Sequence, residues 1–120
     1  MFNIEKLCDS FYALVKIPEK DKAMVKDLGA AATEQVKNNL KPGANLESGE
    51  QNLLMLCVAL TFYQYVLIGM NEQPESIRVG DVSICGGKQA FVSAAQQLIN
   101  HYSQATKGYM KAKFVDFRSV

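Results

Sequence analysis

The stretch that most constrains the fold of this chain is residues 53–70, LLMLCVALTFYQYVLIGM, which contains only two clearly polar residues. The wider segment 51–71 carries no charged residue at all. A helix of this length is about 30 Å long, and without a polar face it must be covered by other protein elements or by lipid. The nearest charges are Glu47, Glu50 and Glu72, so the membrane alternative lacks the basic flank that sets orientation. We therefore expect a central core helix that is buried on most of its circumference.

Three further helices are predicted around this one by apolar residues at helical spacing. The first ends at Pro18, the second runs from about Glu19 to Leu40, and the fourth runs from about Lys88 to Lys111. In the second helix, the small residues 29–32 leave room for another helix to approach closely. The predicted apolar stripes are Ile4, Leu7, Cys8, Phe11, Leu14 and Val15 in the first helix; Met24, Leu28, Ala31, Ala32, Val36 and Leu40 in the second; and Phe91, Ala94, Ala95, Leu98, Tyr102 and Ala105 in the fourth.

A short extended element separates the last two helices. Two runs of alternating aliphatic residues flank the pair Gly80-Asp81, which predicts a two-stranded hairpin. Strands this short are marginal in water, so the hairpin needs a surface to lie on. With 120 residues, residues 1–120 are expected to form one mainly α domain. It comprises four helices, a β-hairpin or extended arm at about residues 75–87, and a short tail at about residues 112–120.

The composition argues against several classes of function. A formal net charge of +1 gives no overall field to attract nucleic acid or an anionic membrane. Cys8, Cys57 and Cys85 are odd in number and widely spaced, which argues against a disulfide scaffold and against a zinc site. We predict a reduced intracellular compartment, no metal, no cofactor and no enzymatic activity.

Each residue that could carry chemistry has a plainer explanation. His101, the only histidine, has no carboxylate beside it, so we expect a partly buried or interfacial side chain and not an acid–base or metal group. Cys85 precedes two glycines, as a reactive thiol near a helix start would, but a strand-to-helix turn needs the same glycines. Phe62, Tyr63 and Tyr65 lack interleaved basic residues, which favours core packing over base stacking. The basic C-terminal end favours a solvated face over nucleic-acid contact.

The most informative feature of the fourth helix is the charge that it lacks. Residues 89–106 contain no Lys, Arg, Asp or Glu, although polar side chains line one face. Charged residues are depleted from the cores of protein–protein interfaces, whereas amides can pair across them. An uncharged helix that simply faces solvent is the alternative. We predict contact with copies of the chain or with a partner. The predicted contact residues are Ile77, Val79, Asp81, Val82, Ile84, Gln96, Gln97, Asn100, Phe114 and Phe117.

In this layout the chain resembles the small head–tail connector (adaptor, head-completion) proteins of tailed phages and prophages. The resemblance rests on the order of IPEKDKAMVKDLGAAATEQV, LLMLCVALTFYQYVLIG, the extended IRVGDVSI, a last helix and the aromatic tail KFVDF. It covers nearly the whole chain in layout, and VGDVSI before the last helix is its most specific string.

The resemblance implies a structural subunit that joins the head portal to the tail and acts by oligomerisation. It implies a ring of about a dozen subunits, through whose lumen DNA passes with non-specific contact. The implied partners are the chain itself and the portal and tail proteins, without a membrane. The implied location is the virion, or the bacterial cytoplasm when a prophage expresses the chain. The hairpin would then be completed by packing or strand pairing with a neighbouring subunit. A small intracellular helical binding or regulatory module is the alternative.

Overall fold

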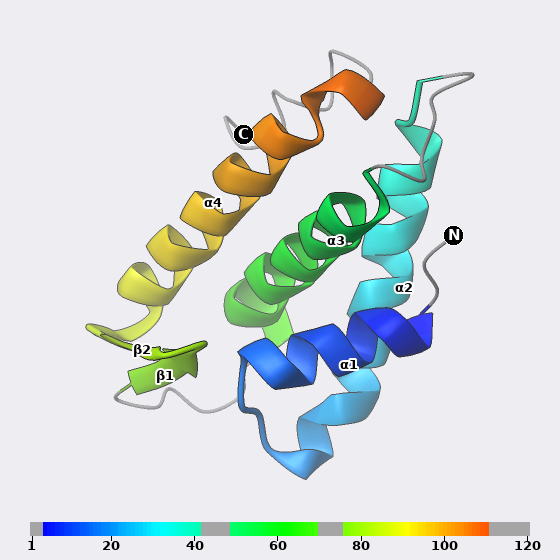
Figure 1. Ribbon diagram of the computed structural model, residues 1–120. Helices are drawn as coiled ribbons and strands as arrows, with labels where there is room; N and C mark the ends of the chain where they lie inside the picture. The colour runs from blue at the N-terminus through cyan, green and yellow to red at the C-terminus, as the bar shows by residue number, and fades with distance from the viewer. Residues whose placement is uncertain (1–3, 42–48, 70–75, 111–120) are drawn as a thin grey trace.

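The computed structural model describes residues 4–41, 49–69 and 76–110, and its elements follow the predicted order (Figure 1). The helices are α1 (Ile4–Leu14), α2 (Lys22–Asn38), α3 (Glu50–Gln64) and α4 (Gly87–Ala105). Short 3-10 turns at Glu19–Asp21 and Lys107–Tyr109 precede α2 and follow α4, and a π-helical turn, Tyr65–Gly69, extends α3. Strands β1 (Ser76–Val79) and β2 (Val82–Cys85) form an antiparallel hairpin. The predicted mainly α fold, with four helices and a hairpin between the last two, is confirmed.

Helix α3 is the centre of this fold. Figure 1 shows it between α2 and α4, with α1 crossing its lower end. Every residue from Leu56 to Phe62 is buried, which leaves no solvent-facing side over two helical turns. By length and composition alone, Glu50–Ile68 would suffice to cross a membrane, but 61% of this window is buried inside the fold. The prediction of a central helix that is buried on most of its circumference is confirmed.

Helix α1 packs against α2 and α3 through its predicted stripe, in which Leu7, Phe11 and Val15 are fully buried. The buried face of α2 is rotated from its predicted position, because Ala31 is exposed. Glycine explains the rotation: a Cβ at Gly29 would lie 2.6 Å from Cδ2 of Leu7, so α1 packs directly on the α2 backbone there. The buried residues of α2 are Val25, Gly29, Ala32, Thr33 and Val36.

Helix α4 packs along α3 through residues spaced by four, which are Phe91, Ala95, Ile99 and Ser103. The sequence identified the first two, but it placed Leu98 and Tyr102 where the structure has Ile99 and Ser103. Both misplaced side chains are half-buried at the edge of the contact. The predicted apolar stripe did not include Ser103, because serine is polar, although its small side chain suits a close helix contact. The helix also ends at Ala105, earlier than predicted.

A buried polar pair joins the end of α3 to the start of α2. The Tyr65 hydroxyl donates a hydrogen bond of 2.6 Å to Oδ2 of Asp21, which is only 4% exposed. The Tyr65 ring also meets the Phe11 ring edge-on, with centroids 6.1 Å apart. An unpaired carboxylate at this depth would cost several kcal/mol. The hydroxyl therefore allows Asp21 to be buried and fixes three helices at one end of the core.

Replacing Gly29 with Ala tests the close approach of α1 to α2. Ala favours a helix over Gly by about 1 kcal/mol, but the new Cβ would overlap Leu7, and overpacking costs about 1–3 kcal/mol. We expect a net loss of up to about 2 kcal/mol in the free energy of unfolding, measured by urea titration. Gly108→Ala is the control, because a Cβ there meets nothing within 4 Å. Equal stabilisation of both variants would contradict this account.

Candidate assembly surface

The hairpin has the register that its sequence predicts. Val79 pairs with Val82 and Ile77 with Ile84, which leaves Gly80-Asp81 as a two-residue turn. Gly80 has a φ of 62°, in the left-handed region that favours glycine and that the common two-residue hairpin turns require.

The hairpin lies on its own chain. Val79 forms an antiparallel bridge with Val15, and the Gly80 amide donates a 2.9 Å hydrogen bond to the Leu14 carbonyl. Ile77 is 6% exposed and belongs to the core. Ile77, one of the predicted contact residues, is therefore covered by its own chain in the single copy. Among the other predicted contact residues, Val79 and Ile84 are half-buried, while Asp81 and Val82 are exposed.

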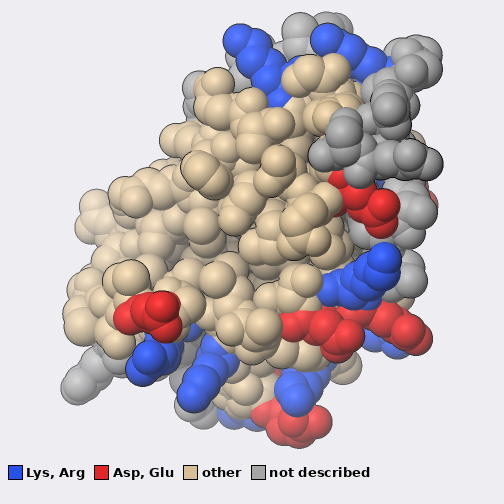
Figure 2. Space-filling view, viewed as in Figure 1, with Lys and Arg blue, Asp and Glu red and all other residues tan. Residues whose placement is uncertain are grey.

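Helix α4 presents an uncharged polar face on the outside of the described chain. Figure 2 shows a broad area free of Lys, Arg, Asp and Glu over α4 and beside α3, with charged side chains along the lower and right sides of the view and at its top. The predicted uncharged face is therefore a real surface feature, and its role in assembly stays a prediction. Of its residues, Ser93, Gln97, Asn100 and Gln104 are exposed and Gln96 is half-buried.

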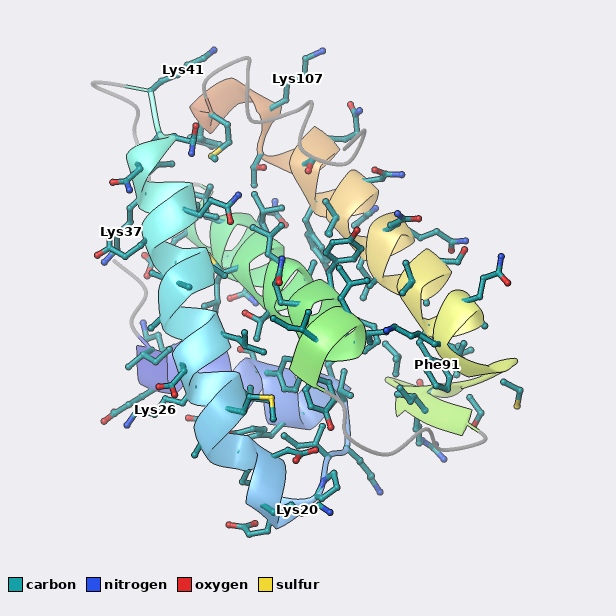
Figure 3. All side chains as sticks on the ribbon, turned by 180° about the vertical axis from the view of Figure 1, so that it is seen from behind. Lys20, Lys26, Lys37, Lys41, Phe91 and Lys107 are labelled. Carbon is teal, nitrogen blue, oxygen red and sulfur yellow. The ribbon has the colours of Figure 1, made fainter. Side chains whose placement is uncertain are left out.

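Charge is concentrated on the other half of the molecule. Figure 3 shows Lys26 and Lys37 along α2, on the side away from α4, and Lys20 on the 3-10 turn that precedes α2. Exposed Asp27 and Glu34 alternate with them, so this side is charged but close to balanced. The structure thus separates a charged half, built from α1 and α2, from a half built from α3 and α4, in which residues 51–64 and 89–105 carry no charge and only Glu50 and Lys88 at the helix starts do.

The structure does not bring the two most reactive side chains together. Cys85 is exposed at the end of β2, whereas His101 lies near the far end of α4, about 20 Å away along the helix at 1.5 Å per residue. His101 is exposed and its ring meets Tyr102 edge-on, with centroids 4.8 Å apart. Of the two predicted alternatives for His101, partial burial is therefore wrong for the single chain, and an interfacial side chain stays a prediction. Because it is the only histidine, Cys85 has no imidazole base nearby.

The aromatic residues of α3 and its extension pack as predicted, since Phe62 and Tyr65 are buried and Tyr63 is half-buried. Phe114 and Phe117 lie outside the described residues. Sequence reasoning missed one exposed apolar side chain, Ile68, which is 72% exposed on the π-helical turn. Its position next to the helix-ending Gly69 was the available signal.

Two buried groups hold their protons more tightly than usual. Burial raises the pKa of the Cys57 thiol to about 12, with a smaller opposing contribution from its hydrogen bond with Thr33. Burial also raises the pKa of the Tyr65 hydroxyl, and its hydrogen bond to Asp21 adds to the effect. A thiol with a raised pKa is a poor nucleophile at neutral pH, so Cys57 has a structural role.

Substituting Asp at two positions on one face of the hairpin tests whether Val82 is free of the core. Val82 is 63% exposed and Ile77 is 6% exposed. We expect Val82→Asp to change the free energy of unfolding by less than about 0.5 kcal/mol, as surface substitutions do. Ile77→Asp buries an unpaired charge and should cost several kcal/mol. Thermal melting at several protein concentrations measures both effects, and a large loss in Val82→Asp would place Val82 in the core.

The raised pKa of Cys57 predicts destabilisation at alkaline pH. Its pKa rises from 9.0 in the unfolded chain to about 12 in the fold, so the unfolded state releases its proton first. The stabilisation is fully present below pH 9.0 and is lost as pH rises toward 12. Urea titrations across this window should show a falling free energy of unfolding. Cys57→Ala should weaken the decline, whereas Cys85→Ala, at an exposed thiol, should leave it unchanged.

Within the described residues, no group of three His, Cys, Asp or Glu side chains is placed to hold a metal ion. The described surface instead offers an uncharged helix face, a mostly exposed strand β2, and two exposed large apolar side chains, Ile68 and Val82. Comparisons with protein-family models, with curated proteins and with solved structures find no match to this chain.

Proposed function

We propose that this chain is a structural subunit of the head–tail connector of a tailed phage or prophage, which acts by assembling with copies of itself and not by catalysis. The observation that carries the proposal is the uncharged outer face of α4 after Lys88, which continues beside residues 51–64 of α3, where no residue is charged either (Figure 2). The layout of the elements, which resembles that of the small connector proteins, supports the choice of assembly.

The α4 face has the chemistry of a surface that becomes covered. Lys and Glu side chains lose favourable hydration when they are buried, so an interface centre avoids them. Each Gln or Asn side chain both donates and accepts hydrogen bonds. Gln96, Gln97 and Asn100 therefore suit a neighbouring backbone or amide without needing an opposite charge. A solvent-facing helix of this chain looks different, as α2 shows with its alternating lysines and acids (Figure 3).

A connector ring requires a head-to-tail contact, because a repeated heterologous contact closes a ring when the rotation between copies allows it. In this proposal the uncharged half of one copy meets a different surface of the next copy. The portal and tail proteins bind the two open sides of the ring. Exposed lysines on α2, such as Lys26 and Lys37, supply non-specific attraction to DNA in the lumen, and the neighbouring acids keep that attraction weak.

A charge placed at the centre of the α4 face tests the proposal. Gln97 is exposed on α4, so Gln97→Lys should leave the melting temperature of the single chain nearly unchanged. If the face is covered in the assembly, the unpaired charge costs several kcal/mol, which weakens association at least about tenfold. Light scattering over a concentration series and binding to an isolated portal ring measure this loss. Ala30→Lys, at an exposed α2 position, is the matched control.

Two results would overturn the proposal. One is a strict monomer of 13.3 kDa at high concentration that also fails to bind a portal ring. The other is equal binding by Gln97→Lys and the unsubstituted chain. Either result would favour the alternative function, a small intracellular helical binding or regulatory module.

A further inference from the structure

His101 places a conditional charge on the outer face of α4. It is the only histidine of the chain, and residues 89–106 around it contain no Lys, Arg, Asp or Glu. Histidine is the side chain whose charge ordinarily changes between pH 5 and 8. The face is therefore uncharged when the imidazole is neutral, and it carries one positive charge when the imidazole is protonated.

His101 lies within the exposed polar face and not at its border. Gln97 stands four residues before it and Gln104 three residues after it, and residues at these spacings are neighbours on the surface of a helix. All three side chains are exposed. The His101 ring meets the ring of half-buried Tyr102 edge-on, with centroids 4.8 Å apart. A neighbour that covers Gln97 and Gln104 would therefore cover His101 as well.

The elements that pack against α4 give a protonated His101 little compensation. These elements are α3, the π-helical turn, β2 and the 3-10 turn after α4. The one carboxylate among them, Glu50, lies 3.8 Å from Nζ of Lys6, and Lys107 is exposed and cationic. Their charged or titratable side chains in the described chain are Glu50, Cys57, Tyr63, Tyr65, Cys85, Lys107 and Tyr109.

We propose that protonation of His101 releases the α4 face from its neighbour, so that association through this face is strong near pH 7.5 and weak near pH 5.5. The inference rests on the connector proposal, because it adds a means of regulation to the same face. It goes beyond that proposal because it makes assembly depend on the pH of the compartment, which the uncharged residues of the face cannot do.

The direction of the effect follows from the chemistry of imidazole. A neutral imidazole donates one hydrogen bond and accepts another, as the amides beside it do. An imidazolium only donates, and an unpaired charge is costly to bury. The proton therefore binds the free chain more tightly than the assembled one. Because such coupling is reciprocal, protonation weakens assembly by the same factor. Association is present above the titration range of histidine and is lost as pH falls through it.

Light scattering over a concentration series at pH 7.5 and pH 5.5 tests the inference. The measured quantity is the ratio of the dissociation constants at the two pH values, which a general loss of affinity in a variant does not change. We expect about a tenfold rise in the dissociation constant at pH 5.5 for the unsubstituted chain, since histidine titrates across this window. The ratio should be close to one in His101→Gln, which stays neutral, and in His101→Lys, which stays charged. Circular dichroism at both pH values checks that each chain remains folded.

Moving the histidine tests whether its place on α4 matters. In the His101→Gln background, Gln97→His returns an imidazole to the same exposed face, one helical turn away, and should restore the pH response. Ala30→His in the same background places it at an exposed position of α2 and should not. Each of these two chains has one histidine, so they differ in its position. Binding to an isolated portal ring gives the same comparison for a chain that does not self-associate.

Three results would overturn the inference and leave the connector proposal standing. One is an equal pH response in the unsubstituted chain and in His101→Gln. Another is a response restored equally by Ala30→His, because a histidine anywhere would then suffice. The third is tighter association at pH 5.5, which would place a carboxylate of the neighbour opposite His101. A strict monomer of 13.3 kDa that also fails to bind a portal ring would instead remove the connector proposal, and this inference with it.

Discussion

The fold depends on α3, a helix whose central part has no solvent-facing side. Burying one Leu, Val or Phe side chain contributes about 1.5–3 kcal/mol, and α3 offers such side chains around its whole circumference between Leu56 and Phe62. One neighbouring helix covers only part of a cylinder, so α3 requires several. Helices α1, α2 and α4 each contact it, and each needs little more than one apolar stripe. Their outer faces are then free to differ. Charged residues therefore lie along α1 and α2, whereas α4 carries none after Lys88.

Hydrophobic burial alone would not fix how these helices align, because it is proportional to area and has no direction. Polar contacts at the C-terminal end of α3 fix how the neighbouring helices are aligned with it. The Tyr65 hydroxyl binds buried Asp21 at the start of α2, and the Lys88 ammonium donates a 3.0 Å hydrogen bond to the Leu67 carbonyl from the start of α4. The Tyr65 hydroxyl and the Leu67 carbonyl both belong to the π-helical turn Tyr65–Gly69. The end of α3 is thereby tied to two helices at once.

Local patterns in the sequence were sufficient to predict the elements but not their contacts. The pair Gly80-Asp81 between aliphatic runs predicted the hairpin and its register, because a two-residue turn leaves little choice. Periodicity predicted four helices, yet it misplaced the buried faces of α2 and α4 by one residue. The buried face of α2 is set by the close approach of α1 at Gly29, and that of α4 by the small side chain of Ser103. A pattern of apolar residues takes account of neither. The bridge from Val15 to Val79 joins distant parts of the chain, so no local pattern encodes it.

The candidate surface was predictable to a similar extent. The absence of charge from residues 89–106 was visible in the sequence, and the structure places the polar members of that segment outward. The burial of Ile77 could not be predicted from the sequence. Alternation along a strand identifies which residues share a face, but it does not say how much of that face the rest of the chain covers. Ile77, Val79, Val82 and Ile84 share one face of the hairpin, but cover by the core declines toward the turn and toward the β2 edge. The three-dimensional positions of α4, which packs against β2, and of the end of α1, which meets Val79, decide where that cover ends.

The junction between β2 and α4 brings the hairpin and the uncharged helix face together. Gly86 and Gly87 have φ values of 117° and 78°, in a region that other residues rarely adopt, and a Cβ at Gly86 would lie 3.0 Å from the Cβ of Ala90. The chain therefore needs these glycines to turn directly from the strand, which ends at Cys85, into the helix, which begins at Gly87. Helix α4 also packs against β2. In the connector proposal, a neighbour that covers the α4 face would thus lie beside the hairpin, because no loop separates the two elements.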